Sequence, residues 1–297
     1  MNGPVVVGVD GSKSSLDAVD AAAREARIRG VSLHVVHAFI WPKMHVSLGP
    51  SPMGPPDGGL RNIAERALNE AVERARATAP DVEVTQDLIT GEALSVLEAQ
   101  SRKASLVVVG SRGMGGFIGL LVGSTAVHLA TYGRCPVLIV RGTPDPEGPV
   151  LLAADGSPAG ESAVGFAFAE ASMRGAELVA LHAWGSWSER GDDDPGHPDN
   201  LVDGLDRLQN TEERVLAEAL SGWQAKYPDV TVRREMVRSR PRQALLEASG
   251  GAQLLVVGAR GRGGFTGLLL GSVSQAALHH ANCPVAVVRA GQITDED

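Results

Sequence analysis

The sequence predicts an α/β protein of two tandem doubly wound domains, each a five-stranded parallel sheet with helices on both faces. The first observation is an internal repeat, because the segment Val5 to Ser12 (VVVGVDGS) returns as Val150 to Ser157 (VLLAADGS). The second is an alternation of apolar runs of strand length with segments of helical period. The third is that these runs are nearly continuous in Val, Ile and Leu, which is typical of strands buried on both faces of a parallel sheet.

The repeat extends over most of the 297 residues. The segment LHVVHA at 33–38 returns as LVALHA at 178–183, and LVVVGSRG at 106–113 returns as LLVVGARG at 254–261. Between the copies, the Pro- and Gly-rich link GTPDPEGP at 142–149 suits neither a helix nor a central strand. We therefore expect two domains, residues 1–143 and 148–297, each long enough to bury its own core.

Each copy is expected to run from strand to helix four times and to end on a fifth strand. In the first copy the strands are predicted at 5–9, 33–38, 82–88, 106–109 and 137–140. The segment 60–75 has the i, i+3, i+4, i+7 apolar spacing of an amphipathic helix. Ligands of such sheets bind beyond the carboxyl ends of the strands, where the strand order reverses. The positions to search are therefore Asp10, Ala38 and Gly110 in the first copy and Asp155, Ala183 and Gly258 in the second.

A glycine-rich loop follows the fourth strand of each copy at the same spacing. GSRG at 110–113 is followed by nine residues and then by GS at 123–124, while GARG at 258–261 is followed by nine residues and then by GS at 271–272. Glycines after a strand let backbone N–H groups approach an anion, and the Gly-Ser pair opens a helix whose N-terminus favours phosphate. A lone loop of this kind is usually a tight turn. Its repetition favours a phosphate clamp in each half. Arg112 and Arg260 either add charge to this clamp or are solvated loop residues.

These features resemble the universal stress proteins, in the tandem two-domain form found in actinobacteria such as mycobacteria. The ATP signature of that family is Gly-x-x-Gly, nine residues, then Gly followed by Ser or Thr, with an Asp closing the first strand, and both copies carry it. The resemblance implies a Rossmann-like fold and ATP, together with Mg²⁺, at two sites per chain. It implies an adenine pocket near Ala38 and Ala183, and it puts Asp10 and Asp155 beside the ribose or phosphates. The alternative for both aspartates is a turn or helix-capping role.

The implied site residues are strand ends, the glycine loop and the start of the last helix. In the first copy they are Gly8, Asp10, Ala38, Gly110, Ser111, Arg112, Gly113, Met114, Gly115, Gly116, Gly123 and Ser124. In the second copy they are Ala153, Asp155, Ala183, Gly258, Ala259, Arg260, Gly261, Arg262, Gly263, Gly264, Gly271, Ser272 and Val273. Because Ala153 stands where the first copy has Gly8, its methyl group is expected to crowd the nucleotide and weaken the second site. No residue is assigned to catalysis or to a metal.

The resemblance implies nucleotide binding in a stress response or in growth regulation, in which ATP selects one conformation or assembly and is hydrolysed slowly at most. The last strands are expected to pair between halves or between chains, giving a homodimer or a pseudo-dimeric monomer that acts on an unknown protein partner. A nucleotide-independent dimerising scaffold stays open as an alternative. An adenylating enzyme is a weaker one, because the loop at 10–15 lacks the Ser-Gly-Gly opening of such enzymes.

Composition and motifs argue against several other classes. A net charge of -8 and a pI near 5.5 disfavour a nucleic-acid partner. No apolar run approaches the roughly 20 residues of a membrane span, so a cytoplasmic protein is expected. A P-loop enzyme would need a Gly-Lys-Ser/Thr sequence, which does not occur. The histidines do not cluster as metal ligands, and His37 and His182 are expected to pack at equivalent strand ends. Cys135 and Cys283 precede buried strands and are expected to have no redox or metal role.

Overall fold

The computed structural model describes residues 3–40, 59–113, 122–184, 198–262 and 269–292, with residues 60 and 198–206 described by their backbone alone. The chain forms two compact units, Met1–Arg141 and Gly142–Glu296. Each unit contains one copy of the sequence repeat.

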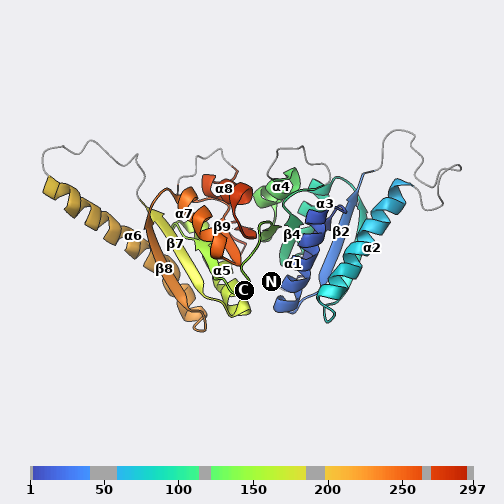
Figure 1. Ribbon diagram of the computed structural model, residues 1–297, viewed down its shortest axis with the longest axis horizontal. Helices are drawn as coiled ribbons and strands as arrows, with labels where there is room; N and C mark the ends of the chain where they lie inside the picture. Colours follow the sequence, from blue (N-terminus) through green and yellow to red (C-terminus); the bar gives the residue numbers. More distant parts are fainter. Residues whose placement is uncertain (1–2, 41–58, 114–121, 185–197, 263–268, 293–297) are drawn as a thin grey trace. The chain divides into compact units, whose positions relative to one another are not determined.

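The first unit is a parallel sheet with a pair of helices on each face (Figure 1). The strand order is β3-β2-β1-β4-β5, and Val5 of β1 is level with Leu33 of β2 on one side and with Leu106 of β4 on the other. Helix α1 packs with α2, and α3 packs with α4. In chain order the elements are β1 (Val5–Val9), α1 (Lys13–Arg29), β2 (Leu33–Phe39), α2 (Leu60–Thr78), β3 (Val84–Thr90), α3 (Ala93–Gln100), β4 (Leu106–Gly110), α4 (Ser124–Tyr132) and β5 (Val137–Val140).

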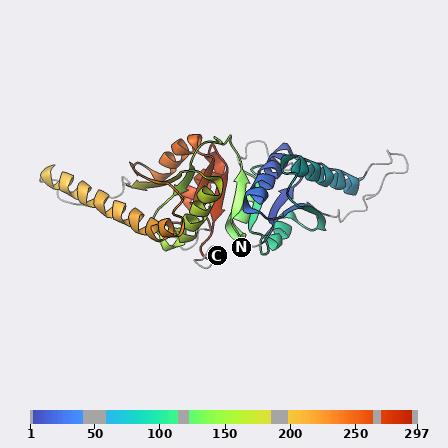
Figure 2. The ribbon, with the colours of Figure 1, turned by 90° about the horizontal axis from the view of Figure 1, so that it is seen from below.

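The second unit repeats this architecture. Its strand order is β8-β7-β6-β9-β10, with Val150 of β6 level with Leu178 of β7 and Leu254 of β9. Helix α6 has 29 residues where α2 has 19, and Figures 1 and 2 show its first turns extending past the strands of its own unit. In chain order the elements are β6 (Val150–Ala153), η1 (Pro158–Gly160), α5 (Glu161–Arg174), β7 (Leu178–Trp184), α6 (Pro198–Lys226), β8 (Val232–Arg238), α7 (Pro241–Ala248), η3 (Ser249–Gly251), β9 (Leu254–Gly258), α8 (Ser272–His280) and β10 (Val285–Val288).

The predicted fold class and the order of elements are confirmed, but one strand is misplaced. The third strand, expected at 82–88, is β3 at Val84–Thr90. Val82 closes a turn instead, and its amide donates to the carbonyl of Ala79 at 3.1 Å. Strand β3 lies at the edge of its unit's sheet and its central residues are exposed, so it lacks the continuous apolar run that marks a central strand.

Polar caps and glycines determine where the first helix of each unit begins and ends. The Ser12 hydroxyl accepts a hydrogen bond from the amide of Ser15 at 3.1 Å and so caps α1. The same helix stops at Gly30, whose φ of 65° is favourable for glycine alone. Ser157 and Gly175 hold the corresponding positions in the second unit. The chain therefore leaves both first strands through the same Asp-Gly-Ser turn.

The strand order reverses between β1 and β4 in the first unit and between β6 and β9 in the second. Loops that leave the two strands at such a point run to opposite faces of the sheet and leave a crevice between them. The Asp-Gly-Ser turn leaves one strand of each pair, and the glycine loop leaves the other. Among the described residues, no helix combines the length and the hydropathy needed to cross a membrane.

Candidate functional site

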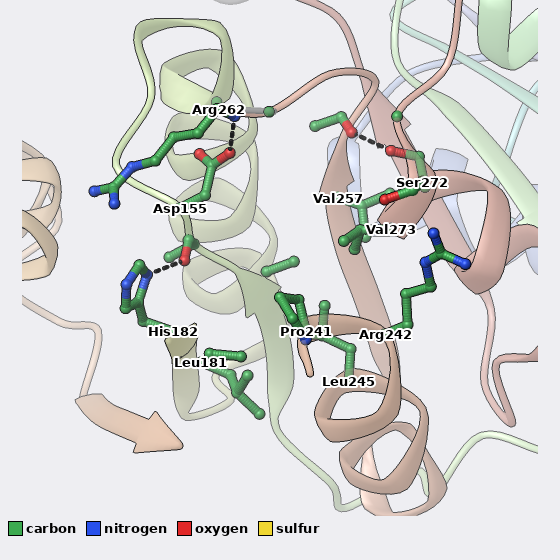
Figure 3. Close-up of a pocket in the computed structure, with 18 of the residues that line it drawn as sticks. Asp155, Leu181, His182, Pro241, Arg242, Leu245, Val257, Arg262, Ser272 and Val273 are labelled. Atoms are coloured by element: carbon green, nitrogen blue, oxygen red, sulfur yellow. Dashed lines mark hydrogen bonds between the residues drawn. The ribbon is translucent and has the colours of Figure 1, made fainter. Parts of the chain in front are cut away.

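A cavity of about 610 Å³ lies in the second unit beyond the carboxyl ends of β6, β7 and β9 (Figure 3). Most of the site residues predicted for the second copy line it, namely Ala153, Asp155, Ala183, Gly258, Arg260, Gly261, Arg262, Gly271, Ser272 and Val273. Ala259 is buried instead, and its carbonyl accepts a hydrogen bond from the amide of Gly271 at 2.8 Å. It therefore positions the start of α8. Gly263 and Gly264 lie outside the described residues.

Asp155 connects the turn after β6 to the glycine loop. Its Oδ1 accepts hydrogen bonds from the amide of Ser157 at 2.9 Å and from the hydroxyl of the same residue at 2.7 Å. Its Oδ2 accepts a hydrogen bond from the amide of Arg262 at 2.8 Å, which Figure 3 shows as a dashed line. The turn-forming role considered from the sequence is thus present, and the same carboxylate also holds the loop.

Gly261 lies so close to Asp155 that no side chain fits between them. A Cβ atom on Gly261 would lie 2.2 Å from Oδ2 of Asp155, well inside the van der Waals contact distance. Helix α8 then begins after Gly271, with no side chain capping its first amides and no acidic residue in its first turn. The uncapped start of α8 therefore presents backbone N–H groups to the cavity that the glycine loop also lines.

One wall of the cavity is a hydrogen-bonded network of three side chains, His182 of β7, Glu212 of α6 and Arg262 of the glycine loop. The Nε2 atom of His182 lies 3.0 Å from Oε2 of Glu212, and Nη1 of Arg262 donates to the same oxygen at 2.8 Å. The Nδ1 atom of His182 lies 2.7 Å from the carbonyl oxygen of Ala154. Burial raises the pKa of Glu212, but the hydrogen bonds from Arg262 and His182 and their charges outweigh it and hold the pKa below its ordinary value.

His182 was expected only to pack at the end of its strand, and that expectation is incomplete because it also lines the cavity. Several other lining residues were not predicted at all. They are Ala154, Gly160, Leu181, Trp184, Leu208, Glu212, Pro241, Arg242, Leu245, Val257, Leu270 and Ser274. Strand ends account for some of them, whereas Glu212 and Arg242 come from helices that carry no glycine motif.

Comparisons with known proteins show the family to which the chain belongs. The model of the universal stress protein family matches residues 1–141 and 148–289. The chain belongs to the universal stress protein family. A universal stress protein of Mycolicibacterium smegmatis is 41% identical over 296 residues, which are 96% of each chain.

Solved universal stress protein structures are similar to the whole chain and to one half of it. The crystal structure of a universal stress protein from Archaeoglobus fulgidus covers 100% of this chain and 98% of its own, with a TM-score of 0.67 and 20% sequence identity, and so has the same fold. A universal stress protein solved in complex with cAMP is 30% identical, covers 47% of this chain and 97% of its own, and has a TM-score of 0.36.

The first universal stress protein repeat has the same local geometry at the described positions. Oδ1 of Asp10 accepts a hydrogen bond from the amide of Ser12 at 3.0 Å, and a Cβ atom on Gly113 would lie 2.5 Å from Oδ2 of Asp10. The amide of Arg112 donates to the hydroxyl of Ser14 at 3.3 Å. The carbonyl of Ser111 accepts from the amide of Gly123 at 2.8 Å, in the manner of Ala259 and Gly271.

The remaining predicted residues of the first repeat are placed by the same elements. Gly110 closes β4 so tightly that a Cβ atom there would lie 2.5 Å from the hydroxyl of Ser14. Ala38 is half-buried near the end of β2, and Ser124 opens α4, which has no side-chain cap. Met114, Gly115 and Gly116 lie outside the described residues.

The two repeats differ next to the first strand. A Cβ atom on Gly8 would lie 2.6 Å from Cδ1 of Leu97, so this leucine fills the space beside Gly8. Ala153 carries the methyl group that Gly8 lacks, and it lines the cavity together with Leu245, the counterpart of Leu97. Leu97 thus occupies the space in the first half that corresponds to the Ala153 methyl group in the second. The weaker second site stays a prediction.

The histidines at the ends of the second strands also differ. His37 is buried, and its Nδ1 atom has no hydrogen-bond partner among the described residues. Burial lowers the pKa of His37, and the opposing charge of Asp10 does not cancel this effect. The counterpart of Glu212 in the first repeat is Ala64, which offers no acceptor. His37 therefore packs as expected, whereas His182 is part of a polar network.

Metal-ligating and reactive groups do not gather in the part of the chain that the structure describes. No group of three or more His, Cys, Asp or Glu side chains is arranged there to hold a metal ion. Cys135 and Cys283 are both buried and form no disulfide, and burial raises the pKa of Cys135 to about 12. A thiol that stays protonated is a poor nucleophile and a poor metal ligand.

Proposed function

We propose that each half of this universal stress protein binds one ATP together with Mg²⁺, two per chain. The bound nucleotide stabilises one conformation or assembly through which the protein acts in a stress response or in growth regulation. The protein acts in the cytoplasm, as a homodimer or a pseudo-dimeric monomer, on a protein partner. Binding is the principal activity, and hydrolysis is slow.

The observation that carries the proposal is the cavity at the strand-order reversal of the second unit. Its volume of about 610 Å³ lies within the range of roughly 300–1,000 Å³ that is typical of small-molecule sites. Leu181, Leu245 and Val257 supply an apolar wall suited to a base near Ala183. The glycine loop and the start of α8 supply backbone donors suited to phosphates.

Magnesium fits this arrangement as a companion of the nucleotide. Mg²⁺ is usually held by substrate phosphates and one or two carboxylates rather than by a cage of protein ligands. Asp10 and Asp155 are the carboxylates against the glycine loops of the two halves. They are the side chains that would complete the coordination of a phosphate-bound ion.

Slow hydrolysis follows from the state of the other carboxylate that lines the cavity. A general base has to take a proton from water, and its efficiency falls as its pKa falls below the working pH. Glu212 is hydrogen-bonded to both Arg262 and His182, and its pKa is lowered. It is therefore a weak proton acceptor, which agrees with binding as the main activity.

Gly261→Ala tests the second site with a single methyl group. Because the added Cβ atom would lie 2.2 Å from Oδ2 of Asp155, the loop has to move away from the carboxylate and from the cavity. We expect ATP affinity at this site to fall by about tenfold or more, the loss of at least one charge-assisted hydrogen bond, in isothermal titration calorimetry with Mg²⁺.

Gly222→Ala in α6 is the matched control, because a Cβ atom there meets open space. It should leave ATP binding unchanged. A Gly261→Ala protein that binds ATP as tightly as the wild type would remove the glycine loop from the site. A wild type that binds no ATP would favour the nucleotide-independent dimerising scaffold.

A further inference from the structure

Arg242 lines the same cavity from a helix that the glycine motif does not include. It is the second residue of α7, and α7 packs against α8, whose first residues Ser272 and Val273 line the cavity as well. Figure 3 shows its side chain extending from the start of α7 on the side of the cavity where Ser272 and Val273 lie. Arg260 reaches the cavity from the glycine loop.

The structure shows no partner for the guanidinium charges of Arg242 and Arg260 in the part of the chain that it describes. Among the residues that the structure describes, neither guanidinium takes part in a hydrogen bond or an ion pair. Arg262 differs from them, since its guanidinium is already paired with Glu212 at 2.8 Å. The described part of the cavity thus has two cationic groups without a partner there, in addition to the backbone donors of α8.

The position of Arg242 is unfavourable unless an anion is present. The N-terminus of a helix carries partial positive charge, so a cation in the first turn is repelled and an anion is attracted. The first turn of α7 contains no acidic residue, and Arg240 at its N-cap makes no side-chain capping bond. An anion bound in the cavity would relieve this repulsion and would also be attracted to the uncapped start of α8.

The first half lacks this group. Leu94 is the counterpart of Arg242, in an alignment supported by Ser101 and Ser249, which are fully buried and accept hydrogen bonds from Arg134 and Asn282 at 2.9 and 3.0 Å. The glycine-loop arginine is present in both halves, as Arg112 and Arg260. At the start of the helix that faces the phosphate clamp, the second half therefore has the cation Arg242 where the first half has the apolar Leu94.

We propose that Arg242 is a specificity-determining residue that makes the second half select a nucleoside triphosphate over a monophosphate, whereas the first half, with Leu94, discriminates less between them. The inference rests on the proposed nucleotide binding and adds the ligand class of one site. A triphosphate chain carries enough charge to meet the α8 amides, Arg260 and Arg242 at once, but a single phosphate does not. Arginine also binds phosphate oxygens through two parallel N–H donors.

The test compares ATP with AMP in a chain that carries Gly113→Glu, so that only the second half is measured. In calorimetric titrations with Mg²⁺, Arg242→Leu is expected to weaken ATP about tenfold, as for one lost charge-assisted bond, and to change AMP less than about twofold. Arg242→Lys should recover most of the ATP affinity. Arg240→Leu, next to the site but not lining it, should change neither ligand. In the reciprocal background, Gly261→Glu, Leu94→Arg should strengthen ATP in the first half more than AMP.

Three results would contradict the proposed role of Arg242. Equal losses for ATP and AMP in Arg242→Leu would make Arg242 a cavity wall and not a selector. An unchanged ATP affinity in a variant whose melting temperature matches the parent's would mean that Arg242 faces only solvent. If the Gly113→Glu parent binds neither nucleotide, the proposed function of the second half is wrong, and the inference falls with it.

Discussion

Asp155 and Asp10 each act on two neighbours at once. One carboxylate oxygen accepts from the amide two residues on, at 2.9 Å in the second half and 3.0 Å in the first, and the other faces a glycine of the loop. The residue after the strand thereby sets both the turn and the distance to the loop. This explains why glycine stands at 113 and 261, where any side chain would push the carboxylate away.

Glu212→Gln tests the network of His182, Glu212 and Arg262. The folded-state pKa of Glu212 is lowered below its ordinary value of 4.5. Such a group stabilises the fold above the unfolded-state pKa and loses this contribution as the pH falls through the folded-state pKa. We expect the wild type to exceed Glu212→Gln in the free energy of unfolding by roughly 1–3 kcal/mol at pH 7. The two should converge as the pH falls below the ordinary pKa of Glu and through the lowered folded-state pKa, in urea titrations.

Glu213→Gln, at the next position of the same helix, is the control, because Glu213 is exposed and, of the residues that the structure describes, hydrogen-bonds to Gln209 alone. It should unfold like the wild type over the whole pH range. A difference between wild type and Glu212→Gln that persists unchanged into acid would show that packing, and not charge, accounts for the loss.

The paired helices of the two halves are joined by different chemistry around one equivalent position of the first helix, Asp20 in α1 and Gly165 in α5. In the first half, Arg74 of α2 donates to both carboxylate oxygens of Asp20 of α1, at 2.8 and 2.6 Å. Burial raises the pKa of Asp20, but the hydrogen bonds from Arg74 and Thr78 outweigh this effect, so the pKa lies below its ordinary value. In the second half, Trp223 of α6 covers Gly165 of α5, the counterpart of Asp20. An ion pair in one half is thus replaced by an aromatic ring on a glycine in the other.

Gly165→Ala should therefore destabilise the second unit even though alanine favours helices. The added Cβ atom would lie 2.4 Å from Cη2 of Trp223 inside a closed contact. We expect the free energy of unfolding to fall by about 1–3 kcal/mol, as in overpacked cores, in chemical denaturation.

Gly222→Ala, one residue before Trp223 on the same helix, meets open space and should stabilise by up to about 1 kcal/mol. If both substitutions stabilised the protein equally, the closeness of Gly165 and Trp223 would be contradicted.

At the scale of the whole molecule, what the two copies share was predictable from the sequence and what distinguishes them was not. Repetition revealed the strands, the Asp-Gly-Ser turns and the glycine loops, because each copy supports the interpretation of the other. Glu212 and Arg242 stand opposite Ala64 and Leu94, so the repeat carries no signal for them. The one usable signal in the sequence is that Arg242 falls in the first turn of a helix, where a cation is unfavourable unless an anion binds nearby. The bounds predicted for β3 were wrong by two residues because this edge strand has no continuous apolar run.

The link between the copies, residues 142–149, is hydrogen-bonded to the second unit, which its composition did not indicate. The amide of Thr143 donates to the carbonyl of Asn282 at 2.9 Å, and the amide of Asp145 donates to that of Ala252 at 3.3 Å. The link is therefore bonded to the second unit, which begins at Gly142. We therefore propose that the second domain begins at Gly142 and includes the link, whereas the Pro and Gly content of the link suggested a start at residue 148.

Native mass spectrometry of the chain with Mg-ATP tests the central claim, two nucleotide sites in one chain, most directly. We expect two ATP on the wild type, one on Gly113→Glu, one on Gly261→Glu and none on the double variant. The reason is that each glutamate would meet the carboxylate of Asp10 or Asp155 and repel phosphate. Two ATP retained on either single variant, or none on the wild type, would contradict this claim.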